Sequence, residues 1–227
     1  MLKGILIDLG DTLTYVDKVE EGRLKEKALL ILGGQGFIID FNELSSSIDK
    51  ALWNSTRGDN KNTYSFWKSL LEKLNLKASP NLISELEELW NENVHKTIRF
   101  YENVIQTLTY LGQKYQLALV SNCAVGTREL LKKIELDSCF KCTILSYELK
   151  VRKPDHKMYL SALDYLRLKP EDCLFVADEI NDLEGAREVG LNTLLVHQGT
   201  HTWDEAIDPN FKPEYECNKF SEIIKLL

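Results

Sequence analysis

The sequence predicts an α/β fold in which a doubly wound parallel sheet carries an inserted, all-helical second domain. Three observations predict it: short apolar runs that do not alternate with polar residues, helical patterns between the later runs, and a long helix-only stretch after the first run. Non-alternating apolar runs are typical of strands buried on both faces of a parallel sheet. Strands that alternate with helices favour a doubly wound arrangement.

Five apolar runs are the expected strands of the sheet. They cover residues 4–7, 117–120, 142–145, 174–177 and 194–196. The segments between the later runs repeat apolar residues at helical spacing, the pattern of a helix with one buried face. These expected helices cover residues 103–112, 127–134, 157–166 and 181–189. Helices thus alternate with the later strands, as in a doubly wound fold.

Between the first and second expected strands lies a stretch that reads as helices only. Its first helix ends at Gly33-Gly34, a common helix stop. Asp40 with Glu43 forms a capping-box-like start, and Ser79-Pro80 combines an N-cap with proline at the first helical position. Four amphipathic helices can form a bundle of their own, although the segment could instead enlarge the core. The expected division is a core domain at residues 1–14 and 99–227 and a helical domain at residues 15–98.

The composition is that of an ordinary globular chain, and it excludes several function classes. Of the 227 residues, 44% are hydrophobic and 28% are charged, and the formal net charge is −7. This negative field would repel phosphodiester backbones, which disfavours nucleic acid as a partner. No apolar run is long enough to span a bilayer, and no leader-like segment opens the sequence. Five cysteines fit reduced thiols better than a disulfide framework, so we expect a cytoplasmic protein without a membrane partner.

Polar residues follow several of the expected strands at the point where each strand ends. In open α/β sheets, ligands bind at the carboxyl ends of the strands, so these side chains should converge on one rim. Several carboxylates would repel one another there unless a hard divalent cation lies among them, and Mg²⁺ usually binds one or two carboxylates plus a substrate phosphate. The candidate rim residues are Asp8, Thr12, Ser121, Asn122, Lys153, Asp178 and Asp182.

The order of these motifs resembles the haloacid dehalogenase-like hydrolase superfamily. The motifs are Asp8-x-x-x-Thr12, Ser121, Lys153-Pro154 and Asp178-x-x-x-Asp182. The helical insertion after the first motif is similar to the branch with a helical cap, which includes many small-molecule phosphatases. Each motif alone is weak, but four in the right order across essentially the whole chain are a strong signal. The resemblance implies a Mg²⁺-dependent phosphatase of a small phosphorylated metabolite.

The resemblance assigns a catalytic role to four of these residues. Asp8 would be the nucleophile and would form an aspartyl-phosphate. Thr12 and Ser121 would hydrogen-bond the transferring phosphoryl group, and Lys153 would hold Asp8 and the phosphate by charge. Phosphoryl transfer depends mainly on positioning and on charge neutralisation, which agrees with these roles.

The resemblance also implies a metal site on the same rim. Asp178, together with Asp8 and the main-chain carbonyl of Gly10, would ligate Mg²⁺. Asp182 would lie at or just behind the metal. All of these ligands are oxygen atoms, which suit a hard cation.

Substrate contacts are indicated less sharply. Ser121-Asn122 and Lys153 are expected to contact the substrate. Arg57 lies in a polar loop between two expected cap helices and could meet a second anionic group on the substrate. The plainer interpretation of Arg57 is a solvated surface arginine. Lys150, near the Lys-Pro motif, has no expected role.

One departure from the family pattern concerns position 10. Phosphatases of this superfamily usually carry a second Asp two residues after the nucleophile, as general acid and then base, whereas this chain has Gly10. A general acid typically contributes ~10²–10⁴-fold to the rate. Asp11 follows immediately, but its side chain should point elsewhere. The departure favours a substrate whose leaving group needs little protonation, such as an anomeric sugar phosphate or an acyl phosphate.

Three alternative functions stay open beside the phosphatase. A 2-haloacid dehalogenase also lacks the second Asp, but it needs no metal, and the retained Asp178 argues against it. A phosphonatase-like hydrolase would need a Schiff-base lysine from the helical domain, for which Lys18, Lys25 and Lys27 are available. A non-catalytic phosphate-binding module is supported only by Gly10.

Other signals are expected to be structural. Cys139-x-x-Cys142 has no second pair, and Cys142 begins an apolar run, so a buried role is favoured over redox or zinc chemistry. His197 and His201 flank a Gly-Thr loop and share no helix face, which disfavours metal binding there. The expected core of the helical domain includes Trp53, Trp67 and Trp90.

Overall fold

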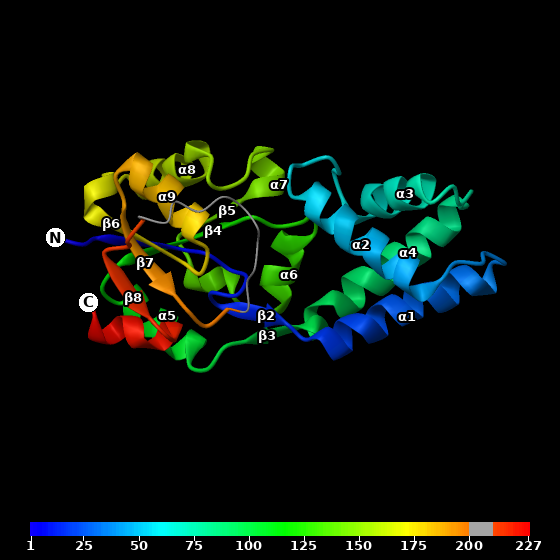
Figure 1. The fold of residues 1–227 in the computed structure, drawn as a ribbon, viewed down its shortest axis with the longest axis horizontal. Helices are drawn as coiled ribbons and strands as arrows, with labels where there is room; N and C mark the ends of the chain where they lie inside the picture. The colour runs from blue at the N-terminus through cyan, green and yellow to red at the C-terminus, as the bar shows by residue number, and fades with distance from the viewer. Residues whose placement is uncertain (200–210) are drawn as a thin grey trace.

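The computed structural model describes residues 1–199 and 211–227 of the chain. Within them, six strands form one parallel sheet in the order β5-β4-β1-β6-β7-β8, in the left-hand body of Figure 1. The strands are β1 (Gly4–Ile7), β4 (Gln116–Ser121), β5 (Cys142–Leu145), β6 (Cys173–Ala177), β7 (Asn192–Val196) and β8 (Tyr215–Cys217). All five expected strands and the predicted fold class are therefore confirmed.

The edge strand β8 is the one strand of this sheet that the sequence analysis did not predict. It has three residues, of which Tyr215 and Glu216 are exposed and Cys217 is buried. It pairs in parallel with β7, with Glu216 opposite Leu195. A short edge strand covers little of the core, so it carries no continuous apolar run that would reveal it.

The sheet is buried on both faces, which explains the continuous apolar runs. Successive residues of a strand point to opposite faces, so in β1 Ile5 and Ile7 join one buried cluster and Leu6 joins another. The first cluster is closed by α5 (Val104–Gly112), α6 (Thr127–Lys133) and the 3-10 helix η4 (Phe220–Lys225). The second is closed by α8 (His156–Leu166) and α9 (Ile180–Val189). Shorter connecting elements are η2 (Asp137–Cys139), α7 (Ser146–Leu149) and η3 (Pro170–Asp172).

Four further helices form the separate helical body on the right of Figure 1, which we call the cap. The cap consists of α1 (Lys18–Gly34), α2 (Phe41–Ser55), α3 (Thr63–Lys73), α4 (Pro80–Asn93) and the 3-10 helix η1 (Val94–Thr97). Asp40 accepts hydrogen bonds from the main-chain N–H groups of Asn42 and Glu43 at the start of α2. Ser79 caps α4 in the same way, ahead of Pro80. In the part of the chain that the structure describes, no helix is both long and apolar enough to cross a membrane.

The cap has a hydrophobic cluster of its own, distinct from the two clusters that flank the sheet. Phe66, Trp67 and Trp90 are buried in it, and the rings of Trp67 and Trp90 lie edge to face with centroids 5.7 Å apart. The prediction that Trp53 belongs to this core is wrong. The Trp53 side chain is 39% exposed, and the Arg152 guanidinium of the core domain lies 4.2 Å from its ring centroid. Trp53 therefore faces the border between the cap and the core domain.

A two-stranded antiparallel ribbon joins the cap to the core domain. It consists of β2 (Thr14–Val16) and β3 (Ile98–Phe100), with Tyr15 opposite Arg99. The chain therefore enters and leaves the cap side by side, between two bodies that have separate hydrophobic clusters. We propose that the domain limits predicted at residues 15 and 98 fall within this ribbon.

Candidate active site

Asp8 follows the central strand β1 at its carboxyl end. Its residue is buried, with 7% of its surface exposed. The Asp8 main-chain N–H donates to the carbonyl of Val176 at 2.9 Å, which extends the pairing of β1 with β6 past Ile7. Asp178 comes directly after β6, so two of the predicted carboxylates lie at the ends of neighbouring parallel strands. This is the rim at which open α/β sheets bind their ligands.

Lys153 forms the electrostatic centre of this rim. Its Nζ lies 2.6 Å from Asp8 Oδ1 and 2.6 Å from Asp182 Oδ2, and the Lys153 side chain is 1% exposed. Burial disfavours the charge, but the carboxylates of Asp182 and Asp8 outweigh it, so the pKa of Lys153 lies above its usual value. Lys153 is therefore a buried cation held between two buried carboxylates.

Asp182 lies at the start of α9, where its carboxylate contacts Lys153. It lies in the first turn of α9, and its carbonyl accepts a hydrogen bond of 2.7 Å from the hydroxyl of Tyr159 on α8. Tyr159 is fully buried. The hydrogen bond fixes the start of α9 against α8 and so holds the Asp182 carboxylate beside Lys153. The contact of Asp182 with Lys153 is a feature that the sequence did not predict, and its position relative to a metal stays a prediction.

Thr12 and Asp178 are directly linked across the rim. Thr12 Oγ1 donates to Asp178 Oδ1 at 2.8 Å, and Thr12 is fully buried. Between Asp8 and Thr12, Gly10 is exposed, and a Cβ placed on it would meet nothing within 4 Å. Position 10 thus has room for a side chain, and steric crowding does not explain the glycine.

Gln198 supports the loop that carries Thr12, a role that sequence reasoning missed. Its side-chain amide N–H donates to the Thr12 carbonyl, and its Oε1 accepts from the main-chain N–H of Phe220 at 2.9 Å. Gln198 thereby connects the segment after β7 to the first motif and to η4. Its only sequence signal is a polar residue shortly after an expected strand, which does not distinguish it from other loop residues.

Ser121 and Asn122 end β4 on the same side of the sheet. Ser121 is buried, with 2% of its surface exposed. Asn122 Oδ1 accepts from the Lys153 main-chain N–H at 2.8 Å, and Asn122 Nδ2 donates to the Lys153 carbonyl at 3.2 Å. The Asn122 amide therefore fixes the main chain of the loop that carries Lys153. Its predicted contact with substrate stays a prediction, beside this positioning role.

Glu179 is a half-buried carboxyl group on the same rim that received no role from the sequence. Burial raises the pKa of Glu179 to about 8, with further increases from Asp182, Asp8 and Asp178 and a decrease from Lys153. A carboxyl with this pKa carries its proton at neutral pH. Its only sequence signal is its place next to Asp178.

Asp11 has a different environment from Asp8. Its backbone adopts a positive φ of 52°, and Tyr101, just after β3, donates from its hydroxyl to Asp11 Oδ1 at 3.3 Å. Burial, followed by the charge of Asp11, raises the pKa of Tyr101 well above its usual value. Asp11 is thus hydrogen-bonded to the residue that directly follows β3 of the ribbon.

The cap contributes Arg57 and three lysines that the sequence singled out. Arg57 is exposed and lines a cleft with the loop that carries Lys153. Lys25 is buried and paired with Asp49 at 2.6 Å and with Glu21 at 3.2 Å. The other two lysines, Lys18 and Lys27, are exposed. Lys25 is therefore an ion-pair partner within the cap, and nothing in the structure singles it out for a Schiff base.

The oxygen donors of this rim suit a hard divalent cation. Within residues 1–199 and 211–227, no three His, Cys, Asp or Glu side chains gather closely enough to hold a metal by themselves. Mg²⁺ needs no such cage, because it usually binds one or two carboxylates and takes its other ligands from water and substrate phosphate. Asp8, Asp178 and the exposed Gly10 main chain supply donors of this kind. The residues fit Mg²⁺, and the assignment stays a proposal.

Cys139, Cys142 and His197, which the sequence singled out, are placed by the structure. All five cysteines are free, and burial raises the pKa of Cys142 to about 11 and also raises the pKa of Cys139. Both thiols are therefore protonated at neutral pH, which suits the expected structural role. His197 is exposed, and its Nε2 lies 3.0 Å from Glu216 Oε2. His201 lies outside the described residues.

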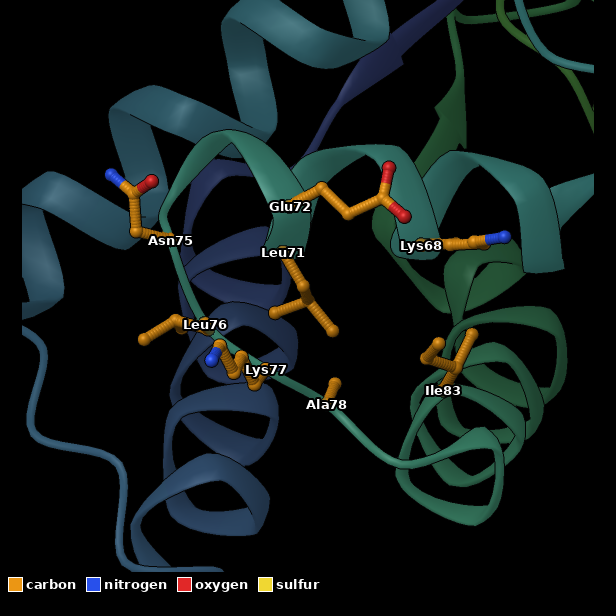
Figure 2. A pocket seen from close by; sticks show the side chains of 8 residues that line it. All are labelled: Lys68, Leu71, Glu72, Asn75, Leu76, Lys77, Ala78 and Ile83. Carbon is orange, nitrogen blue, oxygen red and sulfur yellow. The ribbon is translucent and has the colours of Figure 1, made fainter.

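A separate cavity of about 520 Å³ lies within the cap (Figure 2). Leu71 of α3 and Ile83 of α4 flank it, and the loop at Leu76 and Ala78 crosses below α3. None of the predicted site residues lines this cavity. It is therefore distinct from the rim at the ends of the strands.

Sequence comparison finds relatives whose names describe phosphate chemistry. A glyceraldehyde 3-phosphate phosphatase of Methanopyrus kandleri is 24% identical over 230 residues, which cover 100% of this chain and 97% of the relative. The pyrophosphatase PpaX of Bacillus mycoides is 27% identical over 160 residues, which cover 68% of this chain and 72% of the relative. These two relatives carry names with different substrates.

Structural comparison and a family profile agree on the family. The crystal structure of a 2-haloacid dehalogenase from Pseudomonas syringae pv. Tomato DC3000 matches with a TM-score of 0.77 and 19% identity, covering 100% of this chain and 98% of that chain. At this identity the match shows a shared fold. The profile of the family described as haloacid dehalogenase-like hydrolase matches residues 50–196, more than half of the chain. The motifs, the fold and this match lead to one conclusion: the chain is a member of the haloacid dehalogenase-like hydrolase family.

Proposed function

We propose that this protein is a Mg²⁺-dependent phosphatase that acts on a small phosphorylated molecule through an aspartyl-phosphate on Asp8. The observation that carries the proposal is the buried Asp8 carboxylate at the strand-end rim, with Lys153 Nζ at 2.6 Å from Oδ1. The names of the two sequence relatives support phosphoryl transfer to water as the reaction class.

The contact of Lys153 with Oδ1 leaves the attack to the second carboxylate oxygen of Asp8. In the first step, Asp8 Oδ2 attacks phosphorus, and the bond from phosphorus to the leaving oxygen breaks. In the second step, water attacks phosphorus and the bond to Oδ2 breaks. Inorganic phosphate leaves, and the carboxylate of Asp8 is restored. Splitting one difficult displacement into two easier ones is the advantage of a covalent intermediate.

Charge neutralisation of the phosphoryl oxygens would come from groups fixed in the rim. Lys153 supplies the buried ammonium, and Ser121 supplies a hydroxyl group at the end of β4. The Thr12 hydroxyl donates to Asp178 Oδ1 in this structure and would turn to the phosphoryl group when substrate binds. Bound Mg²⁺ would be held by Asp8, Asp178 and the Gly10 carbonyl, and it would withdraw charge from the phosphoryl group. Groups positioned in advance need no reorganisation during the reaction, and this makes them effective.

Gly10 shapes the substrate class, because it offers no general acid to the leaving oxygen. We propose a substrate with a weakly basic leaving group, such as an anomeric sugar phosphate or an acyl phosphate, whose departing oxygen can leave without prior protonation. Such a group takes its proton from water after the bond has broken. An alkyl phosphate would suffer most from the missing acid, since a general acid typically contributes ~10²–10⁴-fold.

The test is a kinetic screen with p-nitrophenyl phosphate, sugar phosphates, acyl phosphates and alkyl phosphates, each with and without Mg²⁺. We expect Mg²⁺-dependent hydrolysis that Asp8→Asn lowers by at least about 10³-fold, as expected for loss of a nucleophile. Asp11→Asn is the matched control, because it removes the neighbouring carboxylate that binds Tyr101.

Two outcomes of the screen would overturn the proposal. One is equal hydrolysis by the wild type and Asp8→Asn. The other is chloride release from 2-chloropropionate in the presence of a chelator with no phosphatase activity, which would favour the dehalogenase alternative.

A further inference from the structure

A cleft at the border between cap and core domain gathers basic side chains beside the proposed active site. Its volume is about 360 Å³. One wall is Arg57, in the turn that follows α2 of the cap. The other wall is the core-domain loop that includes Lys153. The residues lining the cleft are Arg57, Lys150, Val151, Arg152, Lys153, Pro154 and Asp155.

Basic residues outnumber acidic ones by four to one among the residues that line this cleft. The carboxylate of Asp155 accepts from the main-chain N–H of Lys157 and so caps α8. The ammonium of Lys153 is engaged by buried carboxylates of the rim. Within residues 1–199 and 211–227, neither Arg57 nor Lys150 forms an ion pair. The cleft is thus a region of positive charge in a chain whose net charge is −7.

Contacts between the cap and the core domain hold these cations in place. Gly58 has a positive φ of 79°, and a Cβ there would lie 2.6 Å from the Tyr147 carbonyl oxygen and 2.8 Å from Lys150 Cγ. The turn after α2 therefore touches the core loop directly, which places Arg57 next to Lys150. On the same border, the guanidinium of Arg152 stacks over the Trp53 ring at 4.2 Å.

We propose that this cleft binds a second anionic group of the substrate, a phosphate or a carboxylate. Guanidinium groups match the planar geometry of carboxylates and the oxygens of phosphates, and Arg57 supplies such a group at the cap side of the cleft. A positive cleft in an acidic protein also concentrates anions locally. Lys153 belongs to both sites, because its ammonium contacts Asp8 while its residue lines the cleft.

The inference rests on the proposed function and narrows it. The substrate class becomes a small phosphorylated molecule that carries a second anionic group at a distance from the reacting phosphate. The reacting phosphate lies against Asp8 and Lys153, and the second group lies between Arg57 and Lys150. Lys150, for which the sequence offered no role, becomes a specificity-determining residue at the core side of the cleft.

The test uses phosphonates as inhibitors of p-nitrophenyl phosphate hydrolysis, because their carbon–phosphorus bond resists the proposed chemistry. Propylphosphonate carries one anionic group, 3-phosphonopropionate adds a carboxylate, and propane-1,3-diphosphonate adds a second phosphonate. We call a compound with one such group a monoanion and a compound with two a dianion, whatever the charge of each group. Homologues with four and six carbons cover the distance between the sites. We expect the best dianion to have an inhibition constant at least about tenfold lower than the matched monoanion, as for a charged hydrogen-bonded contact.

Variants then assign this preference to the cleft. Arg57→Ala combined with Lys150→Ala should reduce the ratio of the two inhibition constants to about one, and Arg57→Lys should keep part of it. Lys50→Ala is the matched control, because Lys50 is an exposed lysine on α2 away from the cleft. It should keep the full ratio. Comparing inhibition by 3-phosphonopropionate with inhibition by propane-1,3-diphosphonate shows whether the cleft prefers a carboxylate or a phosphate-like group.

The outcomes distinguish this inference from the proposed function. If p-nitrophenyl phosphate is hydrolysed through Asp8 but dianions and monoanions inhibit equally, the second-anion site is wrong and the phosphatase stands. If the preference persists in the double variant, the cleft is the wrong location. If Asp8→Asn shows no loss of activity, the proposed function itself fails. Calorimetric titration of Asp8→Asn with the same phosphonates tests the cleft without turnover, and an equal affinity for monoanions and dianions contradicts it.

Discussion

Two lysines of one short loop of this protein, Lys150 and Lys153, have opposite surroundings. Lys153 is buried, and each of its two contacts of 2.6 Å reaches a buried carboxylate. Lys150, three residues earlier, is exposed and shares an open cleft with Arg57. A buried charge is costly unless it is paired, whereas an exposed one needs no partner. The buried cation, Lys153, is therefore held in place by its two carboxylate partners. The exposed cations, Lys150 and Arg57, are available to a ligand.

The largest effect should come from removing the buried cation. Lys153→Met leaves the carboxylates of Asp8 and Asp182 without their common partner, so we expect the free energy of unfolding to fall by about 3–5 kcal/mol. Phosphatase activity should fall below detection. Lys150→Met is the matched control and should change stability by less than about 0.5 kcal/mol, as is usual for surface substitutions. Urea unfolding measures both, and equal losses in the two variants would contradict the distinction between buried and exposed cations.

The next effect concerns the position where the rim lacks an acid. Gly10→Asp places a carboxyl group where a Cβ meets nothing within 4 Å, so the protein should tolerate it. Turnover of alkyl phosphates should rise, by up to about 10²-fold, while that of p-nitrophenyl phosphate should change little. Gly10→Asn is the control, because it has a similar shape but no proton to donate at neutral pH. If Gly10→Asn raises turnover as much as Gly10→Asp does, the missing-acid explanation fails.

A smaller effect is a pH dependence of stability in protein kept free of metal by a chelator. Burial raises the pKa of Glu179 from an ordinary 4.5 to about 8. The folded state therefore holds one more proton than the unfolded state between these values, so this group makes stability fall as pH rises from about 4.5 to 8. Glu179→Gln should flatten that slope in thermal unfolding scans. Parallel pH profiles in the wild type and Glu179→Gln would contradict the assignment.

The smallest effect should come from the aromatic support of the cleft. Trp53→Leu removes the ring under Arg152, and exposed cation–π contacts contribute about 0.5–1 kcal/mol. Arg152 lies in the same loop as Lys150, so loss of this contact should loosen the core side of the cleft. The preference for dianionic phosphonates should then fall by about two- to fivefold. Trp53→Phe keeps a ring and should retain more of the preference than Trp53→Leu. A preference that is the same in all three proteins would show that Trp53 does not position Arg152.

Much of the candidate rim could be predicted because it follows from local sequence. Residues directly after buried strands must lie at the carboxyl end of the sheet, and this rule placed Asp8, Ser121 and Asp178. Continuous apolar runs reveal strands with two buried faces, whereas β8 has only Cys217 buried and gave no signal. The capping residues Asp40 and Ser79 likewise act within their own helix turns.

The rest depends on contacts between segments far apart in the chain. Nothing near Asp182 indicates that its carboxylate meets Lys153, because α8 lies between them in the sequence and Tyr159 fixes their approach. Trp53 has the spacing of a core residue, yet it packs on Arg152 from the other domain. The position of Trp53 is set by how the cap meets the core domain, and periodicity within one helix carries no information about that.

The most direct test of the account is to trap the intermediate on Asp8. Wild-type protein is mixed with Mg²⁺ and excess p-nitrophenyl phosphate, quenched in acid within the first turnover, digested and examined by mass spectrometry. We expect a phosphoryl group on the peptide that contains Asp8, absent in Asp8→Asn and in protein treated with chelator. Rapid turnover with no phosphoryl group on that peptide at any quench time, or a phosphoryl group on a different residue, would contradict it.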